Sequence, residues 1–232
     1  MSVLPEAVNR PVTISGAKVN VTLIVLNLIM FGVEILGSDN LVSTWAFVPA
    51  RLTAFLHGQS DPRVLLTLFT SMFMHASLSH ILGNMLFLWV FGPGIEAAFG
   101  SGRYLMFYLA SGVVACLTQY VGSPLSVDPI LGASGAIAGV MGAFLVLYPT
   151  ARIELFIWPI SLFTGLRLHV AAWLMLVIWF ASQVGMGMTG MNAVGDAGGV
   201  AYWAHIGGFA FGAVLALVLR LSAVRSPRYG AY

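Results

Sequence analysis

Charged residues are scarce in this sequence, and that scarcity excludes an ordinary soluble domain. Lys, Arg, Asp and Glu make up 8% of the 232 residues, whereas soluble domains carry about 25%. Ten basic and eight acidic side chains leave a net charge of +2. No basic cluster interleaved with aromatic residues occurs, which argues against nucleic-acid binding. The single cysteine, Cys116, excludes an intrachain disulfide and is expected to be a small buried apolar residue.

Apolar residues are abundant instead. They make up 59% of the chain, and the mean hydropathy is +0.94. Apolar runs of about 20 residues are typical of membrane-spanning helices. The sequence therefore predicts an all-α membrane protein with six transmembrane helices, at residues 19–37, 78–98, 104–122, 132–148, 168–186 and 201–219. The shorter apolar stretch at 153–166, interrupted by Pro159 and Gly165, is predicted to be an interfacial connection.

Basic residues set the predicted orientation. With the N-terminus in the cytoplasm, Arg51 and Arg63 face outside and eight basic residues face inside, namely Arg10, Lys18, Arg103, Arg152, Arg167, Arg220, Arg225 and Arg228. We therefore expect two cytoplasmic tails, at 1–17 and 223–232, around a six-helix domain at 18–222. The apolar loop at 38–77 is expected in the outer interface. The glycine-rich loop at 187–200 is expected to be a mobile cover.

One short motif suggests chemistry: Gly132-Ala133-Ser134-Gly135 opens the fourth predicted span. Small neighbours allow a substrate backbone to approach the serine closely. A helix N-terminus also supplies unpaired N–H groups and a partial positive charge. Alone, the motif equally describes a packing face of small residues between membrane helices.

Three predicted spans carry polar residues at one depth. His80 and Asn84 lie in the first two turns of the second span, Ser134 begins the fourth, and His205 lies about one turn into the sixth. All three spans start from the outside in the predicted topology, so these side chains meet in the outer third of the bilayer. His80 and Asn84 are four residues apart and share a helix face.

The sixth span is predicted to pack closely on the fourth. Gly208 and Gly212 form a small-xxx-small stripe beside His205, and Ser134 precedes a similar series of glycines. We expect His205 to act as the general base for a Ser134 nucleophile. The acidic residues Asp196 and Glu96 are poorly placed to orient the histidine, so a dyad is the economical interpretation.

Donors for an oxyanion are also predicted. His80, Asn84 and the Ser134 backbone N–H are candidates, and Gly132 leaves room for substrate beside them. An alternative is a metal site formed by His75, His80 and His205. The chain has no His-Glu-x-x-His motif and no carboxylate among these histidines, so we expect no metal and no other cofactor.

These motifs resemble those of the rhomboid family of intramembrane serine proteases, of the six-span bacterial type. The resemblance covers residues from about 65 to 215 and rests on His75-Ala-Ser-Leu-Ser-His80-Ile-Leu-Gly-Asn84, on Gly132-Ala-Ser134-Gly135 and on Ala204-His205-Ile-Gly-Gly208-Phe-Ala-Phe-Gly212. It implies a Ser134 nucleophile, a His205 base, and oxyanion-side donors at His80 and Asn84.

The resemblance also implies two structural residues and several departures. His75 matches a histidine that braces the long first loop, and Glu96 matches a glutamate that anchors the inner end of the second span. The departures are Leu66 and Thr67 where some members have Trp-Arg, Ala138 where an aromatic often stacks on the histidine, and Gly83 where a bulky gating residue often precedes the asparagine. What orients His205 therefore stays open at this point.

The expected function is cleavage of transmembrane segments by a Ser134–His205 dyad. Expected partners are the lipid bilayer and membrane-protein substrates whose segments contain helix-weakening residues, because an intact helix hides its carbonyls. We expect a multi-pass protein of the cell membrane with its active site near the outer face. A non-catalytic rhomboid-like module that binds and escorts membrane proteins is the alternative. A transporter is disfavoured, since no predicted span carries an acid at mid-bilayer.

Overall fold

The computed structural model describes residues 16–37, 40–156, 167–190 and 201–225. Within them the chain forms, in order, α1 (Lys18–Leu36), α2 (Asn40–Trp45), α3 (Pro49–Leu56), α4 (Val64–Thr70), the 3-10 helix η3 (Ser71–Phe73), α5 (Leu78–Phe99), α6 (Ser101–Gly122), α7 (Ser134–Leu147), β1 (Arg152–Phe156), β2 (Arg167–Ala171), α9 (Ala172–Gly190) and α10 (Tyr202–Arg225).

Five of the described helices are long and apolar enough to cross a membrane, namely α1, α5, α6, α9 and α10. They confirm the helical membrane bundle that hydropathy predicts. The fourth predicted span is shorter than expected, because α7 has only 14 residues. At 1.5 Å per residue it extends about 21 Å, against about 30 Å for the hydrocarbon core of a bilayer.

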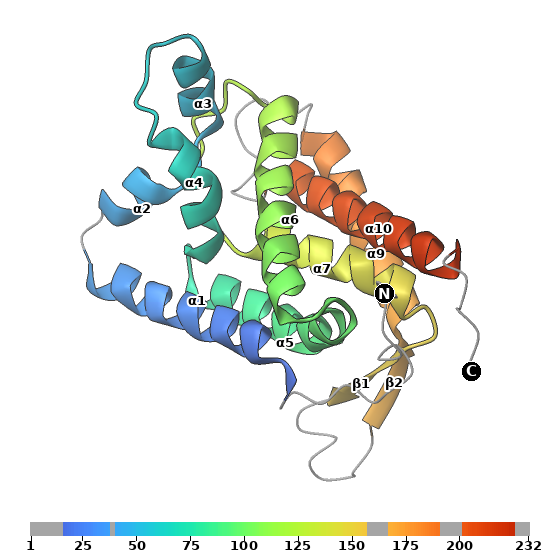
Figure 1. The fold of residues 1–232 in the computed structure, drawn as a ribbon. Coiled ribbons are helices and arrows are strands. Elements are labelled where there is room, and N and C mark those ends of the chain that lie inside the picture. The colour runs from blue at the N-terminus through green and yellow to red at the C-terminus, as the bar shows by residue number, and fades with distance from the viewer. Residues whose placement is uncertain (1–15, 38–39, 157–166, 191–200, 226–232) are drawn as a thin grey trace.

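The short helix α7 lies at the centre of the bundle, between α5 and α6 on one side and α9 and α10 on the other (Figure 1). Ten of its 14 residues are buried. Glycines bring its backbone against α10: an added Cβ at Gly208 would overlap the Gly135 carbonyl, and one at Gly212 would overlap the Gly139 carbonyl. Such close approach is possible only where side chains are absent.

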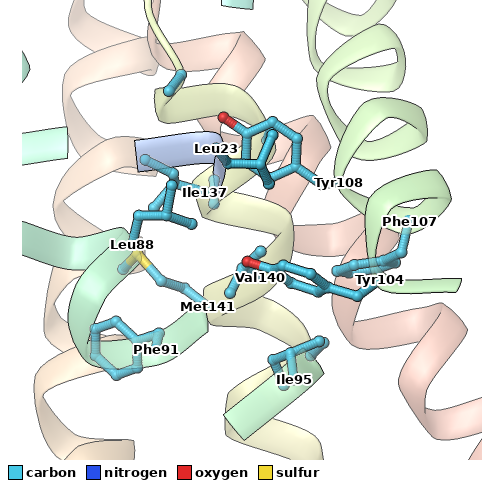
Figure 2. Close-up of a cluster of buried hydrophobic side chains, with 14 of the residues drawn as sticks. Leu23, Leu88, Phe91, Ile95, Tyr104, Phe107, Tyr108, Ile137, Val140 and Met141 are labelled. Carbon is cyan, nitrogen blue, oxygen red and sulfur yellow. The ribbon is translucent and has the colours of Figure 1, made fainter. Parts of the chain in front are cut away.

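Large apolar side chains fill the other face of α7 (Figure 2). They come from α1, α5, α6 and α7 and include Leu23, Leu88, Phe91, Ile95, Tyr104, Phe107, Tyr108, Ile137, Val140 and Met141. The ring of Phe91 also meets Phe144 edge-on, with centroids 5.0 Å apart. The start of α7 is therefore held by close backbone contact on one side and by a packed core on the other.

Glu96, in the last turn of α5, joins that helix to the start of α1. Its carboxylate accepts hydrogen bonds from the backbone N–H groups of Val19 (3.0 Å) and Asn20 (2.7 Å) and from the Ser101 hydroxyl (2.6 Å). No side chain at the start of α1 caps that helix itself. The carboxylate of Glu96 thus satisfies two of the unpaired N–H groups of α1 and lies at the positive end of its dipole.

The segment between α1 and α5 is largely helical rather than an irregular loop. It forms α2, α3, α4 and η3, and its exposed apolar side chains are Trp45, Leu56, Leu65, Leu66 and Phe69. Backbone hydrogen bonds tie it to the residues before α7, since Phe47 and Ile130 exchange both bonds and Gly132 N–H donates to the Ser71 carbonyl at 2.9 Å. The segment therefore helps to place the start of α7.

The region after α7 differs from the prediction. Residues 152–156 and 167–171 form an antiparallel hairpin with Arg152 opposite Ala171, so the predicted fifth span begins in a strand and its helix starts at Ala172. The described part of the predicted interfacial connection at 153–166 belongs to this hairpin, and 157–166 lies outside the described residues. Hydrogen bonds between the backbones of β1 and β2 stabilise these two segments as strands.

The predicted ends of the last two spans also differ. α9 continues to Gly190, so the first four residues of the predicted cover at 187–200 are helical, and the rest lie outside the described residues. α10 continues to Arg225, beyond the predicted end of the helical domain at 222. Most of both predicted tails is likewise outside the described part of the chain.

Candidate active site

Ser134 and His205 meet across the contact between α7 and α10. Ser134 is the first residue of α7, and His205 lies in the first turn of α10. The Ser134 Oγ and His205 Nε2 are 2.8 Å apart, which is hydrogen-bond distance. The glycine contacts between the two helices bring the hydroxyl to the imidazole, because larger side chains would hold the backbones apart.

The pair borders a cavity of about 310 Å³. Its lining comes from α5, α6, α7, α9 and α10 and from the segments before α5 and α7, and includes Ser71, Met72, His80, Asn84, Gly112, Ala115, Cys116, Gly132, Trp179 and Ala204. Ser134 stands at the N-terminus of α7, which is about 9 Å shorter than the hydrocarbon core of a bilayer. The cavity leaves open space beside the Ser134 hydroxyl.

Asn84 and His80, the predicted oxyanion donors, both line this cavity from α5. The Asn84 side chain is only 8% exposed, and its Nδ2 has no hydrogen-bond partner among the described residues. Leaving a buried donor unpaired costs about 1–3 kcal/mol. Such a donor is available to an oxygen that becomes negatively charged during a reaction.

Gly132 makes the approach to these two side chains possible. It has a φ of +122°, and an added Cβ would lie 2.8 Å from His80 Nε2 and 3.5 Å from Asn84 Nδ2. A side chain at this position would therefore be strained by the positive φ and would clash with the His80 ring. The structure brings all five predicted residues of the catalytic and oxyanion sets, including Ser134 and His205, around one cavity.

Two further side chains that contact the His205 ring come from α9, and sequence reasoning did not connect them with this histidine. The His205 Nδ1 lies 2.7 Å from the Gln183 Oε1. The Trp179 ring packs against the imidazole with centroids 5.6 Å apart. Ala138, which stands where an aromatic residue often stacks on the histidine in the resembled family, is fully buried. The available signal was Gln183 itself, a polar residue inside an apolar span, four residues from a tryptophan.

The predicted structural residues occupy separate places. The His75 side chain is buried beside His80, with ring centroids 5.1 Å apart, and its backbone N–H donates to the Glu34 carboxylate. Burial, and secondarily the neighbouring His80, lower the pKa of His75 to about 4. An added Cβ at Gly83 meets no atom within 4 Å, so this side of the cavity is open.

The arrangement of the histidines does not form a metal centre. Across residues 16–37, 40–156, 167–190 and 201–225, no group of three His, Cys, Asp or Glu side chains is placed to hold a metal ion. Both ring nitrogens of His205 already have partners in Ser134 and Gln183. Asp196, which the sequence predicts to be poorly placed to orient the histidine, lies outside the described residues.

Comparison with known proteins agrees with the geometry. The Rhomboid domain family matches residues 62–222. Rhomboid protease GluP of Bacillus subtilis (strain 168) is 42% identical over 78 residues, which are 34% of this chain and 15% of that protein. Rhomboid protein 1, mitochondrial, of Saccharomyces cerevisiae is 31% identical over 197 residues, 82% of this chain and 51% of that protein.

Presenilin-associated rhomboid-like protein, mitochondrial, of Homo sapiens is 29% identical over 179 residues, 72% of this chain and 42% of that protein. The chain thus spans about half or less of the length of these relatives. Two of them are mitochondrial by name and one is bacterial, so together they indicate a multi-pass membrane protein without specifying the membrane. Because the family match covers most of the chain, this protein belongs to the rhomboid family.

Proposed function

We propose that this protein is an intramembrane serine endopeptidase that uses Ser134 as nucleophile and His205 as general base. The observation that carries the proposal is the 2.8 Å contact between Ser134 Oγ and His205 Nε2 at the edge of a cavity, at the N-terminus of a helix too short to span the bilayer. A nucleophile within hydrogen-bond reach of its base is the arrangement that acyl transfer requires.

The reaction proceeds in two halves. Ser134 Oγ attacks a peptide carbonyl carbon while its proton passes to His205 Nε2, and the carbonyl oxygen becomes an oxyanion. That oxygen accepts hydrogen bonds from Asn84 Nδ2, the His80 ring and the Ser134 backbone N–H. Collapse of this tetrahedral intermediate breaks the peptide C–N bond and expels the amine, which takes the proton from His205. Water then attacks the acyl-enzyme with His205 again as base, which releases the carboxylate and restores the serine.

Substrates are proposed to be membrane proteins whose transmembrane segment contains helix-weakening residues near the cut. A carbonyl inside an intact helix is hydrogen bonded and unavailable, so the segment must unwind locally. Small residues such as Gly112, Ala115 and Cys116 line the cavity beside the serine. We place the site toward the outer face of the cell membrane, in line with the distribution of basic residues.

The test compares the wild-type protein with Ser134→Ala in liposomes that contain a single-span reporter substrate. Ser222→Ala is the matched control, because Ser222 is exposed on α10 and its hydroxyl donates to a carbonyl of its own helix. We expect cleavage by the wild type and the control and none by Ser134→Ala. A fluorophosphonate reports directly on the nucleophile. Absence of both cleavage and labelling in the wild type would favour a non-catalytic module that binds membrane proteins.

The oxyanion assignment has its own test. Removing one donor of an oxyanion hole lowers kcat by about 100- to 1,000-fold, so we expect Asn84→Ala to lower kcat in that range with little change in KM. His80→Ala is expected to act in the same direction. Full turnover in both variants would contradict the assignment and leave the Ser134–His205 pair unaffected.

A further inference from the structure

The helix α9 supplies a second hydrogen-bonded partner to His205. Gln183 is 9% exposed and belongs to a helix whose neighbouring side chains Val177, Ile178 and Met186 are exposed and apolar. An amide in such a helix is costly unless its hydrogen bonds are satisfied. Gln183 Oε1 lies 2.7 Å from His205 Nδ1, so the imidazole is the group that satisfies its oxygen.

The surrounding hydrogen bonds fix which way the amide points. The Ser182 hydroxyl donates to the Trp179 carbonyl at 2.6 Å, so its oxygen is left to accept. It accepts from Gln183 Nε2 at 3.1 Å. The amide nitrogen is thereby directed at Ser182 and the amide oxygen at His205. An amide oxygen can only accept a hydrogen bond, so the proton of a neutral His205 ring resides on Nδ1.

That proton position determines the chemistry of the other ring nitrogen. With Nδ1 protonated, Nε2 carries the lone pair and accepts the Ser134 hydroxyl at 2.8 Å. The four groups form a single directed series in which Ser134 donates to His205, His205 to Gln183, and Gln183 to Ser182. In serine proteases with a triad, a carboxylate performs this selection of the tautomer.

We infer that Gln183 is the positioning residue of the catalytic histidine: its side-chain oxygen holds His205 in the tautomer and orientation that let Nε2 accept the Ser134 proton. Trp179, one turn earlier on α9, supports the ring from its side. The inference rests on the proposed serine chemistry. It also makes the catalytic site depend on three helices, because α9 must lie against α10 for the histidine to be oriented.

A neutral orienting group suits this depth in the membrane. A buried carboxylate would need to be desolvated, at a cost of several kcal/mol for an ion in the protein interior. Among the described residues that line the cavity, the titratable groups besides His205 are His80 on α5 and Cys116 on α6, and none is a carboxylate. Because the described lining of the cavity contains no carboxylate, replacing Gln183 by glutamate would add a negative charge beside the imidazole.

Two substitutions and a matched control test the inference. Gln183→Ala removes the acceptor, and Gln183→Glu keeps an acceptor of the same length but adds a negative charge. Gln119→Ala is the control, because Gln119 also ties a neighbouring helix to α10, through its Oε1 and the Ala204 N–H at 3.2 Å, and does not touch the imidazole. All three are measured as full-length protein in liposomes, with fluorophosphonate labelling and reporter cleavage from pH 5 to 9.

Gln183→Ala is expected to lower kcat by about 10- to 100-fold with KM nearly unchanged, since small displacements of a catalytic group cost that much. Gln183→Glu is expected to retain activity. The acid limb of its pH–activity profile should shift to higher pH by about one unit, because a carboxylate favours the protonated ring. Gln119→Ala is expected to stay within about twofold of the wild type. Nitrogen NMR of the His205 ring should show the Nδ1-protonated form in the wild type and a mixture in Gln183→Ala.

The outcomes separate this inference from the proposed function. If the wild type labels and cleaves while Gln183→Ala does so equally fast, with the same pH profile, the positioning role is wrong and the serine chemistry stands. If Gln183→Ala does not fold, an unshifted acid limb in Gln183→Glu overturns the inference just as clearly. If the wild type itself neither labels nor cleaves, the proposed function fails and the inference fails with it.

Discussion

The contact between α7 and α10 predicts the effect of a single methyl group. Gly208 lies one turn beyond His205, and a Cβ added there would overlap the Gly135 carbonyl and lie 3.5 Å from the Ala138 Cβ. The backbone of α7 cannot move aside alone, because its opposite face is packed against the core. Gly208→Ala must therefore separate the two helices.

The size of the separation determines the loss of activity. Carbon and oxygen atoms need about 3.3–3.6 Å between them, so the helices must move apart by roughly 1–1.5 Å. The Ser134 Oγ to His205 Nε2 distance of 2.8 Å would then exceed hydrogen-bond range. A misplacement of about 1 Å costs about 100-fold in rate, and overpacking costs about 1–3 kcal/mol of unfolding free energy.

The assay is reporter cleavage in liposomes together with the thermal unfolding midpoint in detergent. Gly32→Ala on α1 is the control, because an added Cβ there meets no atom within 4 Å. Gly212→Ala should destabilise the protein to a similar degree but reduce turnover less, since it lies about one turn farther from His205. Wild-type turnover and an unchanged midpoint for Gly208→Ala would refute the reasoning.

Three further predictions concern single side chains at or away from the site. Trp179→Leu should lower kcat by about 10-fold through a loosened His205 ring, whereas Trp173→Leu, 47% exposed on the same helix, should not change it. Glu96→Ala should lower the free energy of unfolding by about 2–4 kcal/mol, because three donors lose a charged acceptor; a denaturation curve matching the wild type would contradict this. His75 has a pKa lowered to about 4 by burial, so its contribution to stability is complete above pH about 6.5 and is lost as the pH falls toward 4. His75→Phe should therefore flatten the decline of the unfolding midpoint over that range, and an identical decline in both proteins would count against the assignment.

Local sequence signals determined the class of the protein and most of its site. Membrane spans follow from hydropathy, because a bilayer of fixed thickness requires about 20 apolar residues in a row. The level at which Ser134, His205, His80 and Asn84 meet follows from counting turns from the start of each span. The prediction that these side chains meet needed only these counts and the requirement that glycine-rich helices pack closely.

Features that depend on contacts between elements could not be predicted by counting residues along one span. The apolar run from 132 to 148 predicts a full span, yet α7 has only 14 residues, and ten of them are buried by the surrounding helices. The hairpin at β1 and β2 is likewise stabilised by pairing between segments rather than by a local period.

The orientation of His205 was decided by tertiary structure alone. Gln183 lies 22 residues away on α9, and nothing in the spacing predicts that its amide oxygen faces the imidazole at 2.7 Å. The sequence determined that a serine and a histidine share a depth, since depth is a property of each helix by itself. Only the packing of α9 against α10 decided which ring nitrogen carries the proton, since a hydrogen bond depends on the relative position of two helices to within a few tenths of an ångström.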